Sequence, residues 1–151
     1  LHYSSRRQRQ MCIRDSGKPD VYQGNGSPKV AIAATGSLLL QAIEAQSKLG
    51  EEGIAVTVFN PSCVNNPDVS EVRSLVDDAG GNLITLEDHR EIGGMGSLLT
   101  HALVRDGAKI NLVSMGIGDT FGRSAYKALQ LYEFQNLDAK SLINVVKTKF
   151  L

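Results

Sequence analysis

The chain has 151 residues, a formal net charge of zero, 42% hydrophobic residues and 5% aromatic residues. This length suits one domain with a core of ordinary size. No apolar run approaches the ~20 residues that a membrane-spanning helix needs, and zero net charge argues against a general nucleic-acid binder, which needs a basic surface. Two cysteines, Cys12 and Cys63, argue against a disulfide framework and against a cysteine-based zinc site. We therefore predict a soluble, cytoplasmic domain with no nucleic-acid or membrane partner.

The first sixteen residues differ from the rest in charge. They carry four arginines and one acid, Asp15, without apolar periodicity. A secretory signal would need a continuous apolar stretch, and this segment has none. A basic arm for nucleic acid is one interpretation. We favour the other, in which residues 1–16 are a non-native or disordered leader and residues 17–151 form the folded domain.

Strand and helix patterns alternate through the first half of the folded region. Asp20–Gln23 fits a short edge strand, and Lys29–Ala34 is a continuous apolar run, typical of a strand covered on both faces. Ser37 is predicted to cap a helix that continues to about Leu49. The apolar stripe expected along that helix is Leu38, Ala42, Ala45 and Leu49. Ile54–Phe59 is rich in β-branched residues and predicts the next strand.

The alternation continues through the middle of the chain. Asp68 is predicted to cap a helix, with Glu71 as its capping-box partner. Leu83–Leu86 predicts another strand. A glycine-rich segment, Gly93–Ser97, then opens a helix that should turn Val104 away from its core face. The residues expected on that core face are Leu98, Leu99, Ala102 and Leu103.

Three further elements complete the pattern. Ile110–Met115 predicts a strand, Ser124–Phe134 predicts a helix, and Asp138 is expected to cap the last helix. Leu137 and Leu142 have the spacing of a hydrophobic staple around that cap. Such alternation implies right-handed crossovers that place helices on both faces of a parallel sheet. We predict an α/β fold, a three-layer αβα sandwich with a mostly parallel sheet of about five strands.

Glu87, Asp88 and His89 form the densest polar cluster, where an open α/β sheet usually binds its ligand. An acid–base or metal site is one interpretation. Neighbouring residues of an extended segment point to opposite sides, however, so the three side chains should not converge. We expect these residues to cap a helix, order the loop and contact another domain. No catalytic and no metal-ligating residue is predicted, and Cys63 lacks an adjacent base that would activate it.

The segment with Gly93, Gly94, Gly96 and Ser97 resembles half of a phosphate-binding loop, because backbone N–H groups at a helix start can cradle an anion. A dinucleotide fingerprint would need a third glycine where Leu99 stands, and an acid about 20 residues later. We therefore expect these glycines to permit close packing of backbone and helix. An anion or nucleotide site stays open as an alternative.

Taken in order, several segments resemble the C-terminal domain of transketolase-type thiamine diphosphate enzymes. They are KVAIAATGSLLLQAIEAQSKL, GIAVTVFNPSCVNNPD, LITLEDHREIGGMGSLLTHAL, LVSMGIGDTFGRS and LDAKSLINVVK. Transketolase, 1-deoxy-xylulose-5-phosphate synthase and the beta subunits of 2-oxo acid dehydrogenases share this domain type. The resemblance implies the same three-layer fold from about Gly17 onward.

The resemblance also implies a division of labour. In such enzymes the two preceding domains bind thiamine diphosphate and Mg²⁺, and the diphosphate motif of the family is missing from this sequence. The implied role is that of a C-terminal section of an enzyme of the pentose phosphate type. It would transfer no group by itself and would pack against the thiamine-binding domains, within a homodimer or a hetero-oligomer. The candidate contact or anion loops run over residues 87–97 and 116–123, and include Asp119 and Arg123. The alternative role is partner docking, as in dehydrogenase beta subunits.

Overall fold

The computed structural model describes residues 17–118 and 124–151, and it places five strands in one sheet of order β1-β3-β2-β4-β5. The strands are β1 (Asp20–Gln23), β2 (Val30–Ala34), β3 (Val56–Asn60), β4 (Asn82–Arg90) and β5 (Asn111–Ile117). The helices are α2 (Leu38–Glu51), α3 (Val69–Asp78), α4 (Met95–Arg105), α5 (Ala128–Gln135) and α6 (Ala139–Lys149). Only the edge strand β1 runs antiparallel to its neighbour. The mostly parallel sheet predicted from the sequence is confirmed.

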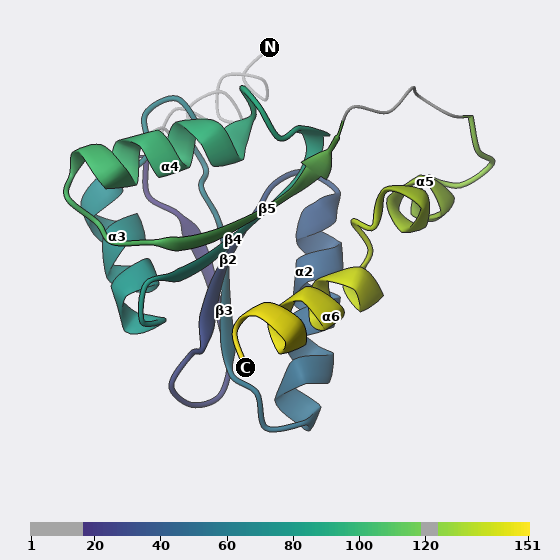
Figure 1. Ribbon diagram of the computed structural model, residues 1–151, viewed down its shortest axis with the longest axis horizontal. Coiled ribbons are helices and arrows are strands. Elements are labelled where there is room, and N and C mark those ends of the chain that lie inside the picture. The colour runs from purple at the N-terminus through teal and green to yellow at the C-terminus, as the bar shows by residue number, and fades with distance from the viewer. Residues whose placement is uncertain (1–16, 119–123) are drawn as a thin grey trace, which may run out of the picture.

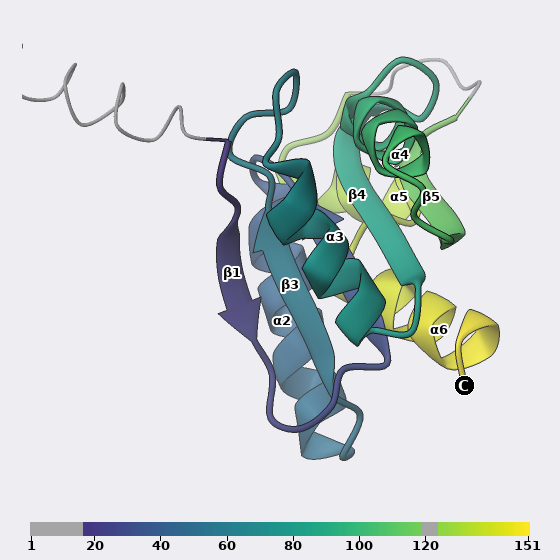
Figure 2. The ribbon, with the colours of Figure 1, turned by 90° about the vertical axis from the view of Figure 1, so that its left-hand side faces the viewer.

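Helices cover both faces of this sheet. In Figure 1 the sheet is seen nearly edge-on, with α3 and α4 on one side and α2 and α6 on the other. Figure 2 shows β1 at the outer edge beside β3. Since every crossover between parallel strands passes through a helix, the three layers follow from the order of the elements.

The central strand β2 supplies both cores because it is buried at every position. Its alternating residues Val30, Ile32 and Ala34 face the α2/α6 layer, and Ala31 and Ala33 face the α3/α4 layer. Small alanines on the second face leave room there for the ring of Phe59, which is fully buried. The apolar run of this strand therefore reflects two buried faces, as the sequence predicted.

The predicted apolar stripe of α2 is confirmed at all four positions, Leu38, Ala42, Ala45 and Leu49. The prediction for α4 is wrong at Leu98, whose side chain is 46% exposed, and Ala102 is only half-buried. Met95 and Gly96 face the sheet instead, together with Leu99 and Leu103. The helix begins at Met95, so its buried stripe starts in the glycine-rich segment and not after it. Val104 lies on the solvent side, as expected.

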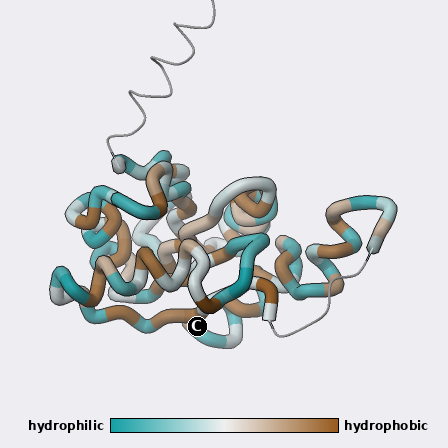
Figure 3. Tube along the Cα trace, turned by 90° about the horizontal axis from the view of Figure 1, so that it is seen from above, coloured by the Kyte–Doolittle hydropathy of each residue, from teal (hydrophilic) through white to brown (hydrophobic). Residues whose placement is uncertain are grey.

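Two element boundaries also differ from the prediction. Strand β4 continues to Arg90, beyond the predicted end at Leu86, because β5 pairs alongside it as far as Ile117. Helix α5 begins at Ala128 and not at Ser124. It has no buried residue and stands away from the three layers in Figures 1 and 3. Apolar periodicity is a weak guide for a helix that packs so little.

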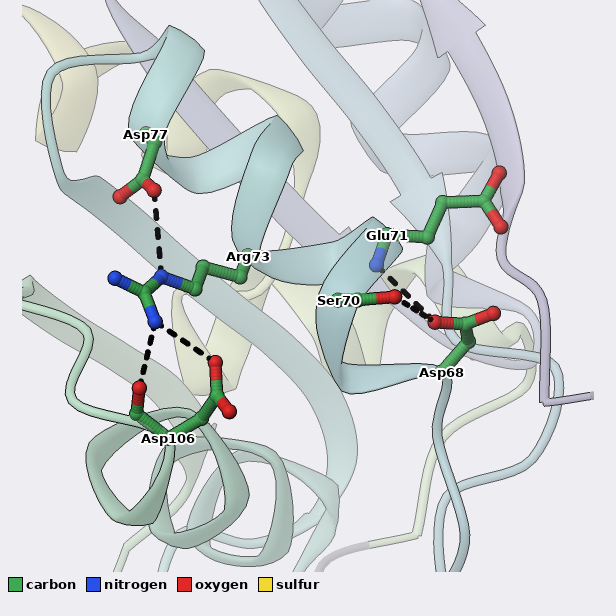
Figure 4. Close-up of polar contacts among 6 residues, drawn as sticks. All are labelled: Asp68, Ser70, Glu71, Arg73, Asp77 and Asp106. Atoms are coloured by element: carbon green, nitrogen blue, oxygen red, sulfur yellow. Dashed lines mark hydrogen bonds and ion pairs between the residues drawn. The ribbon is translucent and has the colours of Figure 1, made fainter.

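An arginine connects the two helices on one face of the sheet (Figure 4). Arg73 of α3 donates from Nη1 to the backbone oxygen of Asp106 at 2.6 Å and to its carboxylate at 2.9 Å, at the end of α4. Its Nε lies 3.4 Å from the Asp77 carboxylate, one turn along α3. The hydrogen bond to Asp106 raises the pKa of the Arg73 guanidinium above its ordinary value. A cation at the carboxyl end of α4 also complements the helix dipole.

No helix among the described residues is long and apolar enough to cross a membrane.

Asp68 caps α3, as the sequence predicted, but the capping box with Glu71 does not form, because the Asp68 amide donates to the Gly17 backbone oxygen at 2.8 Å. Its carboxylate accepts from the Ser70 hydroxyl at 2.7 Å and from the Glu71 amide at 3.1 Å (Figure 4). These bonds, the hydroxyl first, hold the pKa of the Asp68 carboxyl below its ordinary value. The cap therefore stabilises the fold above about pH 4, and this contribution is lost as the pH falls through the lowered pKa.

We expect Asp68→Ala to lower the free energy of unfolding at pH 7, and we expect the deficit to shrink as the carboxylate of the parent protein is protonated. Urea unfolding followed by circular dichroism between pH 2.5 and pH 7 measures both. Asp68→Ser is the matched control, because serine caps without titrating, so its difference from Asp68→Ala should persist at low pH. A deficit that is independent of pH would contradict the assignment.

Candidate functional site

The polar cluster at the carboxyl end of β4 separates onto different sides of the strand. Glu87 is buried, 2% exposed, beneath the start of α4. Asp88 is exposed on the opposite side, where its carboxylate accepts from the Ser37 hydroxyl beside α2 at 3.2 Å. His89 is exposed, with Nδ1 3.3 Å from the backbone oxygen of Arg90. The prediction that the three side chains do not converge is confirmed.

Glu87 holds the N-terminus of α4. Its Oε2 accepts from the Met95 amide at 2.6 Å, and its Oε1 accepts from the Gly96 amide at 2.9 Å. These amides are among the four that no helix can satisfy internally, and they point along the positive end of the helix dipole. The carboxylate therefore occupies the position that an external anion would take. The predicted capping role is confirmed for Glu87.

The glycines of this loop give that carboxylate its space. A Cβ on Gly94 would lie against the Glu87 carboxylate and 2.6 Å from the Arg90 backbone oxygen. A Cβ on Gly96 would lie 2.5 Å from the Thr85 hydroxyl and 3.1 Å from Glu87 Oε1. Gly93 has a φ of +85°, which favours glycine. The glycines permit close packing, as predicted from the sequence.

Ser97 fastens the loop that precedes α4. Its hydroxyl accepts from the Gly93 amide at 3.0 Å and donates to the Glu91 backbone oxygen at 2.8 Å. One side chain thus binds the two peptide groups that flank Ile92. Behind the loop, Gly116 of β5 leaves room for Glu91, because a Cβ there would lie 2.9 Å from Glu91 Cγ. Sequence reasoning placed these residues in a contact loop but missed these bonds.

A second hydroxyl network connects α5 to the sheet. The Ser37 hydroxyl lies 2.5 Å from the Tyr132 hydroxyl of α5 and also donates to Asp88. The prediction that Ser37 caps α2 with its side chain is wrong, because no such bond forms. The partners of this hydroxyl are a carboxylate on β4 and a phenol on α5, so Ser37 links these two elements beside α2.

The remaining candidate residues do not gather into a site. No group of three or more His, Cys, Asp or Glu within residues 17–118 and 124–151 could hold a metal ion. His101 is exposed on α4, and Cys63 is half-buried in its loop. Asp119 and Arg123 lie outside the described residues. Thr85 and Thr100 keep buried hydroxyls without a hydrogen-bond partner.

An open hollow of about 740 Å³ lies between β5 and α6. Val113 and Met115 on one wall and Val145 on the other are apolar, whereas Lys140 and Asn144 are polar. The lining also includes the carboxylates of Glu91, Glu133 and Asp138. The hollow reflects incomplete coverage of the edge strand by α6.

Comparison with known proteins decides the family. The family model "Transketolase, C-terminal domain" matches residues 21–142. The chain belongs to the transketolase C-terminal domain family. A solved structure entitled "Split gene transketolase, inactive beta4 tetramer" is similar with a TM-score of 0.76 and 28% identity, over 89% of this chain and 41% of that one.

Curated relatives agree with this family. The chain is 31% identical over 129 residues to a subunit of the apulose-4-phosphate transketolase of Actinobacillus succinogenes, covering 85% of this chain and 40% of the relative. It is 31% identical over 113 residues to a putative transketolase C-terminal section of Methanocaldococcus jannaschii, covering 75% and 34%. It is also 36% identical over 116 residues to 1-deoxy-D-xylulose-5-phosphate synthase of Thermomicrobium roseum, covering 75% and 18%. The chain thus spans two fifths or less of the length of these curated relatives.

Thiamine diphosphate and Mg²⁺, which this family implies, do not fit the described residues. The amides of α4 that suit a phosphate already bind Glu87, and its buried carboxylate would repel a diphosphate at that position. No Asp, Glu, His or Cys cluster in the described part of the chain offers a divalent cation the ligands it needs.

The Glu87 carboxylate is predicted to stabilise the domain as a resident anion. Glu87→Ala should lower the free energy of unfolding by about 3 kcal/mol, because two buried amides lose charge-assisted bonds. Glu87→Gln, whose amide oxygen can still accept a bond, should lose less. The vacated space matches a small carboxylate, so acetate should raise the melting temperature of Glu87→Ala more than that of the parent protein.

Asp88→Ala is the matched control, because the neighbouring carboxylate is exposed and makes a single hydrogen bond of 3.2 Å in the described structure. Its cost should be within about 1 kcal/mol. Calorimetry in acetate and in chloride at equal ionic strength separates specific rescue from screening. Equal stability of Glu87→Ala and Asp88→Ala would contradict the role of Glu87.

Proposed function

We propose that this chain is the C-terminal section of a cytoplasmic, transketolase-type enzyme that transfers a two-carbon ketol unit between sugar phosphates, a reaction of the pentose phosphate type. Residues 17–151 would form the domain, following a leader that is not part of it. Thiamine diphosphate and Mg²⁺ would be held by the preceding domains, in the same chain or in a separate one. This section would contribute packing between domains and subunits, within a homodimer or a hetero-oligomer.

The observation that carries this proposal is the occupation of the α4 N-terminus by Glu87. Of the described features, this helix start is the one that most resembles a phosphate site, and an internal carboxylate neutralises it. What remains exposed around it is a tightly built loop, which suits contact with another protein surface. Two relatives are named as parts of a transketolase, one as a subunit and the other as a C-terminal section, which supports a part that works with other chains or domains.

The experiment below also distinguishes two alternative functions. The relationship to 1-deoxy-D-xylulose-5-phosphate synthase supports a different thiamine-dependent ketol reaction as the second candidate for the parent enzyme. Docking of a partner, as in the beta subunits of 2-oxo acid dehydrogenases, uses the same kind of contact surface. A free-standing anion or nucleotide site is disfavoured, because Glu87 fills the amides that such a site would use.

The isolated chain is expected to show no turnover of ketose and aldose phosphates with thiamine diphosphate and Mg²⁺. Mixed with the thiamine-binding section of transketolase from the same organism, it should form a complex and give ketol transfer. Size-exclusion chromatography and a coupled transketolase assay measure the two outcomes. Calorimetric titration of the isolated chain with inorganic phosphate, nucleotides and ribose 5-phosphate should give flat traces.

Substantial turnover by the isolated chain, or saturable phosphate binding that Glu87→Gln leaves unchanged, would overturn the proposal. Complex formation with turnover of pyruvate and glyceraldehyde 3-phosphate, and none with two sugar phosphates, would assign the parent to the second candidate reaction.

A further inference from the structure

The most exposed large aliphatic side chain of the described residues, Ile92, stands on a loop whose backbone is hydrogen-bonded on both sides of it. Ile92 is 89% exposed, at the tip of the connection between β4 and α4. Single exposed apolar residues are ordinary on protein surfaces. What distinguishes Ile92 is that the backbone on both sides of it is fixed.

The fixation has three independent components. The Ser97 hydroxyl binds the Glu91 oxygen and the Gly93 amide, so it closes a ring around Ile92. The Glu87 carboxylate fixes the amides of Met95 and Gly96 just beyond the loop. These contacts come from a helix and a strand, so the fold holds the backbone that carries Ile92.

The third component is the edge strand β5. Arg90 still pairs with Ile117 of β5, so the sheet continues to the base of the loop. Gly116 lies against the backbone of His89 and the side chain of Glu91, at distances that leave no room for a Cβ. The loop is therefore seated on the sheet as well as fastened to α4.

Rigid presentation of an apolar side chain lowers the entropic cost of association. Hot spots at protein interfaces are side chains of this kind, which enter a pocket on the partner and are surrounded by polar residues. The residues around Ile92 include Glu91 and Arg90, charges of opposite sign, which fit a polar rim and not a lipid surface or a nucleic acid.

We propose that Ile92 is the anchor of a preformed docking loop, residues 89–94, that enters an apolar pocket on the thiamine-binding part of the enzyme. This inference rests on the proposed function and names the contact that joins the two parts. The match covers only 34–41% of the transketolase relatives compared above, so most of each relative lies outside this domain and is large enough to supply the pocket. Ser97 is a positioning residue for this anchor, because it touches the loop and not the partner.

The test compares variants of this chain in complex formation with the thiamine-binding section of transketolase from the same organism, loaded with Mg²⁺ and thiamine diphosphate. Ile92→Asp should weaken the dissociation constant at least tenfold, because a charge replaces the buried anchor. Ser97→Ala should weaken it about threefold to tenfold, and hydrogen exchange of residues 91–94 in the free chain should become faster. Val104→Asp is the matched control, since Val104 is 55% exposed on α4, and it should change affinity less than about twofold.

Isothermal titration calorimetry gives the affinities, and circular dichroism verifies that each variant is folded. If the parent chain does not bind the thiamine-binding section, the proposed function fails. If the parent chain binds and Ile92→Asp binds equally well, the docking loop is refuted while the proposed function stands. Faster exchange in Ser97→Ala with unchanged affinity would refute the role of rigidity. Self-association of the parent chain that Ile92→Asp abolishes, without any effect on binding to the thiamine-binding section, would assign the loop to a second copy and overturn the proposed occupant.

Discussion

The contact between the Glu87 carboxylate and the first two amides of α4 determines how the carboxyl end of this sheet is built. A buried carboxylate is costly unless its charge is compensated, and a helix N-terminus buried without acceptors is costly as well. Each group removes the penalty of the other. Because the strand supplies the acid and the helix supplies the amides, the contact also fixes the helix against the sheet.

This geometry explains why the loop looks like a phosphate site in sequence. A phosphate-binding loop and the loop of this domain both need glycines, because in both an anion approaches the backbone closely. The difference lies in the source of the anion. Here the anion is the Glu87 side chain, which comes from the strand that precedes the loop. The absence of Cβ atoms at Gly94 and Gly96 leaves room for this carboxylate, which is part of the protein itself. An acid on the strand just before a glycine-rich helix start is the signal that separates the two cases.

The elements that could be predicted from the sequence are those that bury a continuous face. Strand β2 and the stripe of α2 were predictable because the residues they bury are all apolar. The cap at Asp68 was predictable because it depends on residues three apart. The placement of Leu98 was not, because it depends on α4 starting inside the glycine segment, which in turn depends on Glu87, eight residues before Met95.

Side chains with long-range partners were the least accessible to sequence reasoning. Ser37 had the pattern of a local cap, yet its hydroxyl turns to Tyr132, 95 residues away, and to Asp88. Ser97 was recognised as a member of a contact loop, while its two bonds across Ile92 require the turn of the chain that only the folded structure provides. Local chemistry predicts that a polar group needs a partner, and the fold decides which partner it obtains.

The residues of the two cores and the residues at the tip of the exposed loop between β4 and α4 do not overlap. Its two cores are formed by alternating faces of the same strands, and neither contains Ile92 or Ser97. Substitutions at exposed positions outside these cores cost little stability. If the proposed docking role of Ile92 holds, substitutions at the loop tip will alter association without loss of the fold. Glu87 contributes both to stability and to the order of the loop, since it binds the first amides of α4. A substitution at Glu87 is therefore expected to change the stability of the domain and the order of the loop together.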